Sequence, residues 1–180
     1  KGRKLAPRPN LVKATPAELV KYLESPEGYT RHFARRVLYE RGVKQGRPAL
    51  DAWVASLDPV KQEPELLEAL WTYQTFDVVN KKLLLSLLQA REDRVRAAAV
   101  RVLSAWSDRV DNVLGLLERR VADEHPQVRL EAVRALGQLG TARAAELALR
   151  ALDRPLDTNL DYGLWLTLRE LEPAWLPELQ

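Results

Sequence analysis

The chain has 180 residues, 46% of them hydrophobic, and its 28 Lys and Arg against 25 Asp and Glu give a net charge of +3. This length and hydrophobic content are enough for one continuous core, and the low net charge excludes a disordered chain. The sequence contains no cysteine, which excludes disulfides, thiolate nucleophiles and zinc–sulfur sites.

Residues 1–24 are expected to form a linker followed by a lead-in helix. They begin with KGRKLAPRPN, which has no initiator methionine and no signal peptide, and which is similar to a linker within a longer protein. The longest apolar stretch of the chain, KKLLLSLLQA, is far shorter than the roughly 20 residues that a membrane helix needs. Because charged residues flank it, we expect a core helix there.

A repeat occupies the rest of the chain. Two segments, REDRVRAAAVRVLSAW and DEHPQVRLEAVRALGQLG, are near copies whose matching residues lie 33 positions apart: Val95-Arg96, Ala99 and Leu103 in the first, and Val128-Arg129, Ala132 and Leu136 in the second. A fainter copy, SPEGYTRHFARRVLYERG, lies about two periods upstream, and DTNLDYGLWLTLREL begins a last copy with Leu160 in place of Val128. Such a period is typical of stacked repeats. The predicted units are residues 25–58, 59–90, 91–122, 123–153 and a truncated 154–180.

Each unit is predicted to contain two helices. The first follows a turn with Pro or Asp, as at Pro126, because proline suits the first turn of a helix. Val128, Ala132 and Leu136 then form one apolar stripe, and Gly140 ends the helix. The second helices include RVDNVLGLLERRV and ARAAELALRAL, and neither helix of a pair can bury its stripe alone. The predicted fold is therefore all-α: a right-handed α-solenoid, or α-α superhelix, of about five helical hairpins.

These residues resemble HEAT repeats, whose units carry a turn, a VRxxAxxAL helix and a second helix. The resemblance is strong in HPQVRLEAVRALGQLG and DRVRAAAVRVLSAW, fair at 25–42 and weak at 60–76. Tetratricopeptide repeats are the nearest competitor, but their period of 34 comes with a Trp–Leu–Gly–Tyr pattern that is absent here. The resemblance implies an armadillo-like superhelix in which second helices line the concave face.

Both ends of the chain resemble a narrower family. PRPNLVKATPAELVKYLESPEGYTRHFARRVLYERG and ALDRPLDTNLDYGLWLTLRELEPAWLPEL are similar to the large membrane-bound dehydrogenase, or PVC-type haem-binding, proteins of planctomycete and verrucomicrobia bacteria. In that family a β-propeller like that of sugar dehydrogenases precedes the HEAT segment, and a c-type cytochrome domain follows it. The resemblance implies a fragment of a larger redox protein of the periplasm or cell envelope, with a cytoplasmic location left open. Haem attachment needs Cys-x-x-Cys-His, so no cofactor is expected within these 180 residues.

Arginines recur with the repeat and have two interpretations. A row of guanidinium groups at one angle can hold phosphates, and such binding depends strongly on salt. The resemblance to HEAT arrays favours a ladder, in which the arginine of each VR pair bonds an acid at a turn or helix end of a neighbouring unit. The predicted ladder consists of Arg31, Arg96, Arg129, Asp93, Asp123 and Asp157.

No catalytic or metal site is predicted. His32 and His125 lack a partner at ligand spacing and are expected to be turn and helix-start residues. Acid pairs such as Asp157 and Asp161 are expected at helix starts, where they complement the helix dipole. The tryptophans are expected to fill gaps between layers, with base stacking as the alternative: Trp53, Trp71, Trp106, Trp165 and Trp175. Trp175 belongs to the truncated last unit, where an exposed face is expected.

The sequence therefore predicts a non-catalytic scaffold that binds a protein, either a neighbouring domain of its parent chain or another protein. Neither a membrane nor a nucleic acid is expected as the partner. The contact residues are expected on second helices: Asn80, Lys81, Asn112, Arg119, Arg143 and Arg150. The alternative is a nucleic-acid-binding protein similar to HEAT-like alkyl-base DNA glycosylases, which requires a basic concave groove, an exposed tryptophan and a catalytic aspartate.

Overall fold

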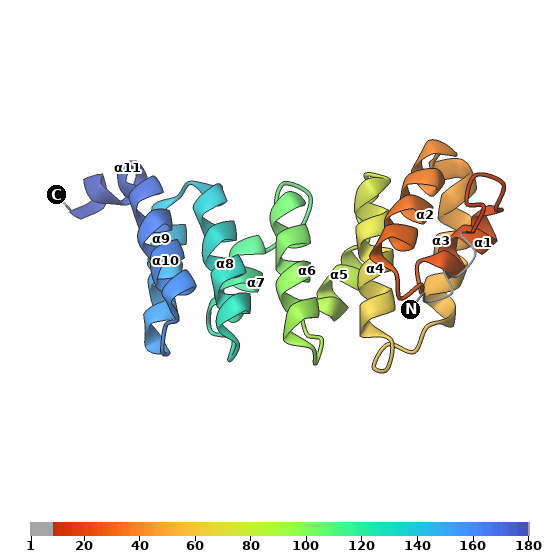
Figure 1. Ribbon diagram of the computed structural model, residues 1–180. Helices are drawn as coiled ribbons and strands as arrows, with labels where there is room; N and C mark the ends of the chain where they lie inside the picture. Colours follow the sequence, from red (N-terminus) through yellow and green to blue (C-terminus); the bar gives the residue numbers. More distant parts are fainter. Residues whose placement is uncertain (1–8, 180) are drawn as a thin grey trace, which may run out of the picture. The chain divides into compact units, whose positions relative to one another are not determined.

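The computed structural model describes residues 9–179 and divides into two compact units, Lys1–Val78 and Val79–Gln180 (Figure 1). Residues 1–8 of the expected linker lie outside the described residues. Within residues 9–179 the chain forms helices and no strand, which confirms the all-α prediction. The division between the units falls inside the predicted repeat 59–90.

The first unit contains four helices in its described part: α1 (Pro16–Tyr22), α2 (Gly28–Glu40), α3 (Val43–Ser56) and α4 (Glu63–Thr75). α1 begins at a capping box, in which the Thr15 hydroxyl accepts from the Glu18 amide and the Glu18 carboxylate accepts from the Thr15 amide at 2.7 Å. α1 packs against both α2 and α3. Trp53 of α3 is buried, and its indole nitrogen donates to Glu24 Oε1 at 2.7 Å, so the core of this unit is fixed by a polar contact as well.

The second unit is an α-solenoid of helical hairpins (Figure 1). Its first helices, which pack side by side in chain order, are α6 (Asp93–Ala105), α8 (Pro126–Leu139) and α10 (Thr158–Glu170). Its second helices are α5 (Lys81–Leu87), α7 (Val113–Val121), α9 (Ala142–Leu149) and α11 (Glu172–Trp175), and the short 3-10 helices η1 (Arg150–Asp153) and η2 (Leu176–Leu179) follow the last two. α9 packs on α7, α8 and α10, so neighbouring pairs cover one another's apolar faces.

The apolar stripe of the first helices recurs at fixed positions. Counted from the N-cap residue, the third, seventh and eleventh residues of α6 and α8 are buried: Val95, Ala99 and Leu103, and Val128, Ala132 and Leu136. Gly140 ends α8 with a φ of 67°, a left-handed conformation that glycine adopts without steric cost. Pro126 occupies the first turn of α8. The predicted stripe, start and end of this helix are therefore confirmed.

An arginine closes the turn in front of α2, α6 and α8. Arg31, Arg96 and Arg129 each lie four residues after the N-cap. Each guanidinium donates to the carbonyl six residues earlier: Ser25 at 2.7 Å, Ala90 at 2.9 Å and Asp123 at 2.9 Å. These carbonyls follow the end of the preceding helix, where backbone acceptors lack helical partners and a cation is favoured. The bond that the three arginines share is therefore the one to a backbone carbonyl, whereas their acid partners differ.

Arg96 also meets a predicted acid of the ladder. Its Nε and Nη2 donate to the two carboxylate oxygens of Asp123, both at 2.9 Å, and both residues are buried. The same carboxylate accepts the His125 amide at 3.0 Å and Arg120 Nη1 at 3.2 Å. Arg120 in turn donates to the Leu88 carbonyl at 2.8 Å. The network thus joins the end of α5, α6, the end of α7 and the start of α8.

Arg129 occupies the same place in the next unit but has no acid partner. It donates only to backbone carbonyls, including that of Pro155 at 2.5 Å, and no carboxylate of residues 9–179 lies within ion-pair distance. Pro155 stands two residues before the N-cap Asp157, just as Asp123 stands two before the N-cap His125. A proline therefore occupies the position of the aspartate. Arg129 is 2% exposed and its Nε has no hydrogen-bond partner.

Arg31 differs from the prediction because its acid comes from a helix interior. Arg31 Nε lies 2.8 Å from Oε1 of Glu68, in the middle of α4, and not from an acid of a turn. Arg35, one helical turn later, lies 2.6 Å from the other oxygen of Glu68. The buried carboxylate is thus shared by two arginines of α2, and this pairing ties α2 to α4 within the first unit.

Among residues 9–179 neither Asp93 nor Asp157 forms an ion pair with an arginine, so the structure places neither of them in the predicted ladder. Asp93 Oδ2 lies 3.3 Å from His125 Nε2. Asp157 is the N-cap of α10, and its Oδ1 accepts the Leu160 amide at 2.8 Å. An N-cap carboxylate satisfies the free amides of its own helix, and this local bond holds Asp157 away from Arg129.

The environment of Asp123 lowers the pKa of its carboxyl group. Burial by itself raises the pKa of this carboxyl, but the hydrogen bonds from Arg96 and the His125 amide, together with the charges of Arg96 and Arg120, outweigh burial and hold the pKa below its ordinary value. The folded state therefore binds this proton less readily than the unfolded chain does. The stabilising contribution is present above the unfolded pKa of about 3.9 and is lost as the pH falls through the folded pKa.

Asp123→Asn is expected to lower the free energy of unfolding at pH 7 by about 3 kcal/mol, because it leaves the Arg96 charge buried without a counter-charge. The asparagine oxygen still accepts the His125 amide, so the turn itself is retained. Urea unfolding measured between pH 7 and pH 2 checks both the loss and its sign: the difference from the native chain should shrink at acid pH.

Glu124→Gln is the matched control for that experiment. Glu124 Oε1 also lies near Arg96, at 3.6 Å from Nη2, but its side chain is 83% exposed. An exposed pair of this kind contributes less than about 1 kcal/mol. Equal losses for the two variants would contradict the assignment of the stabilising pair to Asp123.

Pro155→Asp is expected to stabilise the second unit by about 1–2 kcal/mol, because a carboxylate at this position can pair with the buried Arg129 as Asp123 does with Arg96. Thermal unfolding of Pro155→Asp and Pro155→Ala measures the gain, since both lose the proline and only one adds a charge. A Pro155→Asp variant no more stable than Pro155→Ala would show that the position cannot supply the missing acid.

Candidate functional site

The residues with a predicted partner contact lie at the second helices of the second unit. Asn80 precedes α5, and its side-chain oxygen accepts the Leu83 amide at 3.1 Å. Asn112 precedes α7 with a φ of 55°, a left-handed conformation that asparagine tolerates better than most residues. Both asparagines therefore have a local role in starting a helix, beside any contact they make with a partner.

The predicted cations lie on an exposed surface that carries both signs of charge. Three of them are in ion pairs: Lys81–Asp111, at 2.8 Å between Nζ and Oδ2, Arg150–Glu118 and Arg143–Glu146. Arg119 is exposed at the end of α7 and makes no ion pair with any residue in the part of the chain that the structure describes. A surface of paired charges suits a protein partner of matching pattern better than it suits a polyanion.

Two of these ion pairs connect successive layers of the solenoid. Glu118 lies on α7 and Arg150 directly follows α9, while Asp111 precedes α7 and Lys81 begins α5. Neither acid was predicted as a partner of these cations from the sequence. A signal existed, because Glu118 and Arg150 lie 32 positions apart and Lys81 and Asp111 lie 30 apart, close to the repeat period. The hydrogen bond from Lys81 also lowers the pKa of Asp111.

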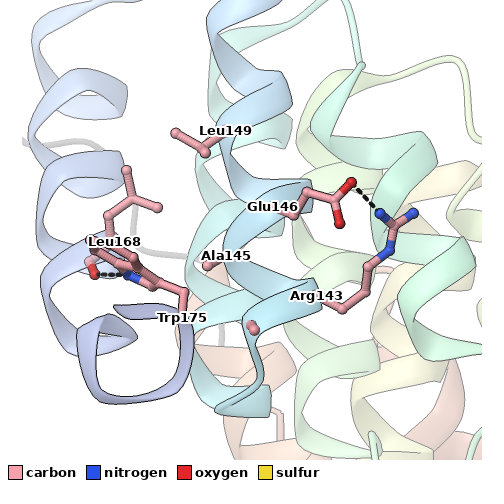
Figure 2. Close-up of a pocket in the computed structure, with 7 residues that line it drawn as sticks. Arg143, Ala145, Glu146, Leu149, Leu168 and Trp175 are labelled. Atoms are coloured by element: carbon pink, nitrogen blue, oxygen red, sulfur yellow. Dashed lines mark hydrogen bonds and ion pairs between the residues drawn. The ribbon is translucent and has the colours of Figure 1, made fainter. Parts of the chain in front are cut away.

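An apolar hollow of about 620 Å³ lies beside α9 (Figure 2). Ala142, Ala145 and Leu149 of α9 line it together with Leu168 of α10 and Trp175 of α11. Figure 2 shows the Trp175 ring next to Leu168 of α10, and its indole nitrogen donates to the Leu168 carbonyl at 2.9 Å. Arg143 and Glu146 of α9 also line the hollow, and because they form an ion pair they add no net charge to it.

The hollow lies next to the shortest of the second helices. α7 has nine residues and α9 has eight, but α11 has four and is followed by the 3-10 helix η2. Leu168 occupies the eleventh position after its N-cap, at which Leu103 and Leu136 are fully buried, yet it is only partly covered. The short α11 therefore leaves Leu168 less covered than Leu103 and Leu136, which longer second helices accompany.

The arginines of the VR pairs do not form an exposed row. The exposed arginines of the repeat lie at another position of the unit, and the first two of them pair with Glu40 and Glu131: Arg36, Arg101 and Arg134. Arg96 and Arg129 are buried and their donors point to protein oxygens, while Arg31 and Arg35 share the carboxylate of Glu68. These guanidinium groups are therefore occupied within the fold. A phosphate-binding row of the kind considered from the sequence would need them in solvent.

The tryptophans divide between the interior and the surface. Trp53 and Trp106 are buried, which fits the expected role of filling space between helices. The guanidinium of Arg35 lies over the Trp71 ring, 5.5 Å from its centroid. Trp165 is exposed on α10, with the Arg169 guanidinium 5.3 Å from its centroid.

The histidines have structural contacts. His125 is the N-cap of α8, where its Nδ1 accepts the Gln127 amide at 3.3 Å, and His32 lies edge-on to Phe33 in α2. Residues 9–179 hold no group of three or more His, Asp or Glu side chains placed to bind a metal ion. Among the same residues, no helix is both long enough and apolar enough to cross a membrane.

The comparison with known families bears on the second unit. Residues 81–161 match the family model of HEAT repeats. This segment is therefore similar to HEAT repeats. It runs from the first residue of α5 to the early part of α10 and so includes the Arg96–Asp123 network, while no curated protein matches the chain. HEAT repeats indicate a repeat scaffold with a role in protein interaction.

The double variant Glu118→Gln with Arg150→Gln is expected to change the free energy of unfolding by less than about 1 kcal/mol, because both side chains are partly exposed and their pair is screened by water. Chemical denaturation of the purified chain measures the difference. A loss well above that value would show that this HEAT-repeat surface is needed for folding, and it could then not be altered freely to test binding.

Proposed function

We propose that the chain is a non-catalytic scaffold that binds a protein through its second-helix surface, which we define as Lys81, Arg119, Arg143, Arg150 and the acids paired with them. The observation that carries this proposal is the HEAT-repeat match over the helices that bear these residues. The exposed ion pairs support it, because paired charges on rigid helices specify a partner by their pattern.

We further propose that the chain is not an enzyme and needs no cofactor of its own. The support comes from the sequence, which has no cysteine and lacks any recognisable set of nucleophile, base and oxyanion donors. In this proposal the chain acts by geometry: its helices hold a partner, or two neighbouring domains, in a fixed position.

The setting of the chain is a separate proposal. The resemblance of both ends to PVC-type haem-binding dehydrogenases supports a place within a larger redox protein of the periplasm or cell envelope, with the HEAT repeats between a propeller and a cytochrome domain. The complete gene tests this directly. A downstream Cys-x-x-Cys-His is the expected finding, and a gene without it would leave a repeat scaffold with no redox role.

The competing function is nucleic-acid binding of the alkyl-base DNA glycosylase type. The exposed Trp165 beneath Arg169 favours it, since an aromatic ring next to a cation is a platform for a base. The occupied state of Arg31, Arg96 and Arg129 weighs against it, because the phosphate backbone would have to bind elsewhere.

The double variant Arg119→Glu with Arg150→Glu is expected to lose most of the protein that the native chain captures, because it reverses charge at two points of the second-helix surface. The measurement is quantitative cross-linking and capture from a lysate of the organism that carries the gene. In parallel, fluorescence anisotropy with single- and double-stranded DNA at about 150 mM salt should show no affinity tighter than about 1 µM.

Arg94→Glu with Arg134→Glu is the matched control, since it reverses two exposed arginines on the first helices α6 and α8. This control should capture the same protein as the native chain. Loss of capture by both double variants would place binding outside the second-helix surface. Submicromolar DNA binding that falls with salt would instead favour the nucleic-acid function.

A further inference from the structure

A groove of about 250 Å³ lies between the first helices α6 and α8, which pack side by side in the middle of the second unit. Arg101 of α6 and Arg134 of α8 both line it. They occupy the same position of the repeat, nine residues after the N-caps Glu92 and His125. The groove is therefore formed by the stacking of two complete repeats.

Two side-chain contacts join the helices across the groove. Nε of Arg101 lies 3.0 Å from Oε1 of Glu131 on α8, and the Glu131 side chain is buried. The hydroxyl of Ser104 on α6 donates to the side-chain oxygen of Gln138 on α8 at 2.6 Å. Because both contacts link α6 to α8, they hold the two sides of the groove at a fixed separation, and the groove is preformed.

Arg134 gives the groove a charge that these contacts do not neutralise. It is exposed, and it makes no ion pair or hydrogen bond with any residue of the described range 9–179. Two arginines against the single Glu131 leave a net charge of +1 on the lining. Gln138 adds donors, because its oxygen already accepts from Ser104 and its amide nitrogen carries two N–H groups. The groove is therefore complementary to one negative charge with acceptor oxygens.

The carboxylate of a glutamate has this chemistry. A guanidinium pairs with a carboxylate through two parallel N–H···O bonds, and a single carboxylate neutralises a net charge of +1. Ala105 and Ala135 also line the groove, so the methylene groups of a glutamate can pack on apolar surface while its carboxylate lies at Arg134.

The lining favours a protein segment over a nucleic acid or a small molecule. Among the described residues that line the groove none is aromatic, so a base would have no ring on which to stack. Sites for small molecules bury most of the ligand surface. A small ligand here would remain largely in water, because four of the lining residues are exposed: Arg101, Ala105, Arg134 and Gln138. A protein segment can add contacts along the helices on either side.

We propose that this groove binds the side-chain carboxylate of an acidic protein segment, with Arg134 as the residue that pairs with it. The proposal concerns the first helices and does not depend on the partner of the second-helix surface. Arg94→Glu with Arg134→Glu, the control for that surface, should therefore lose the acidic segment and still capture the partner of the second helices.

The test is a titration of the full chain with the peptide hexaglutamate, followed by the NMR signal of the Gln138 side-chain amide. The signal should shift with a Kd below about 1 mM at about 50 mM salt, and the Kd should increase as added salt screens the exposed charges. Arg134→Ala should raise the Kd at least fivefold. Arg119→Ala is the matched control, because Arg119 is also an exposed arginine without an ion pair among residues 9–179, but lies on α7.

Glu131→Gln separates binding in the groove from a general loss of structure. The glutamine retains an acceptor for Arg101 and raises the net charge of the lining from +1 to +2. Hexaglutamate should therefore bind at least threefold more tightly to this variant than to the native chain. A variant that had merely lost structure would bind less tightly, and weaker binding by a folded Glu131→Gln chain would contradict the proposal.

Three further results would overturn it. An unchanged Gln138 signal at about 5 mM hexaglutamate would show that the groove does not bind a carboxylate. Binding that Arg119→Ala removes and Arg134→Ala retains would place the acidic segment on the second helices. Tighter binding of the single-stranded DNA hexathymidylate than of hexaglutamate would make a nucleic acid the ligand. Thermal unfolding of each variant is measured first, so that a change in Kd reports the groove.

Discussion

The hydrogen bonds from an arginine to the carbonyls ahead of its own helix are the interaction on which the hairpins depend. Each turn between a second helix and the next first helix leaves backbone acceptors without helical partners, and the guanidinium can bind several of them at once. Arg31, Arg96 and Arg129 do this at the same position after the N-cap, in both compact units. The buried alanines and leucines can stack in register because this turn has a fixed geometry.

The repeat pattern predicted much of this fold and less of the surface. Val128, Ala132 and Leu136 predicted the stripe of α8, and the Arg96–Asp123 pair matches the predicted bond from a VR arginine to a turn acid of the neighbouring unit. The partner of Arg129 was not predictable in this way, because the interval between N-caps shortens from 33 to 32 residues and brings a proline to the critical position. The spacing of the repeat alone does not show that Arg129 then bonds the backbone carbonyl of Pro155.

The ion pairs between second helices were not predictable from the sequence for a different reason. Residues about one period apart meet only where neighbouring helices align, and this alignment depends on the packing of the helices between them. The hollow beside α9 is similar, because the space beside Leu168 depends on the position of the Trp175 ring. The periodicity of the sequence thus predicts the repeat fold. The surface contacts and the hollow depend on the residues that depart from this periodicity.

Because the charge of Arg129 has no counter-charge, the two turns that flank α8 differ in the free energy that their transient opening costs. Separating α10 from α8 would bring this guanidinium into water and recover hydration that the folded state forgoes, whereas opening the turn before α8 would break a buried ion pair. Separation of α10 from α8 therefore costs less free energy than opening of the turn before α8. Amide protons of α10 would exchange with solvent before those of α6, and the solenoid would fray inward from α11.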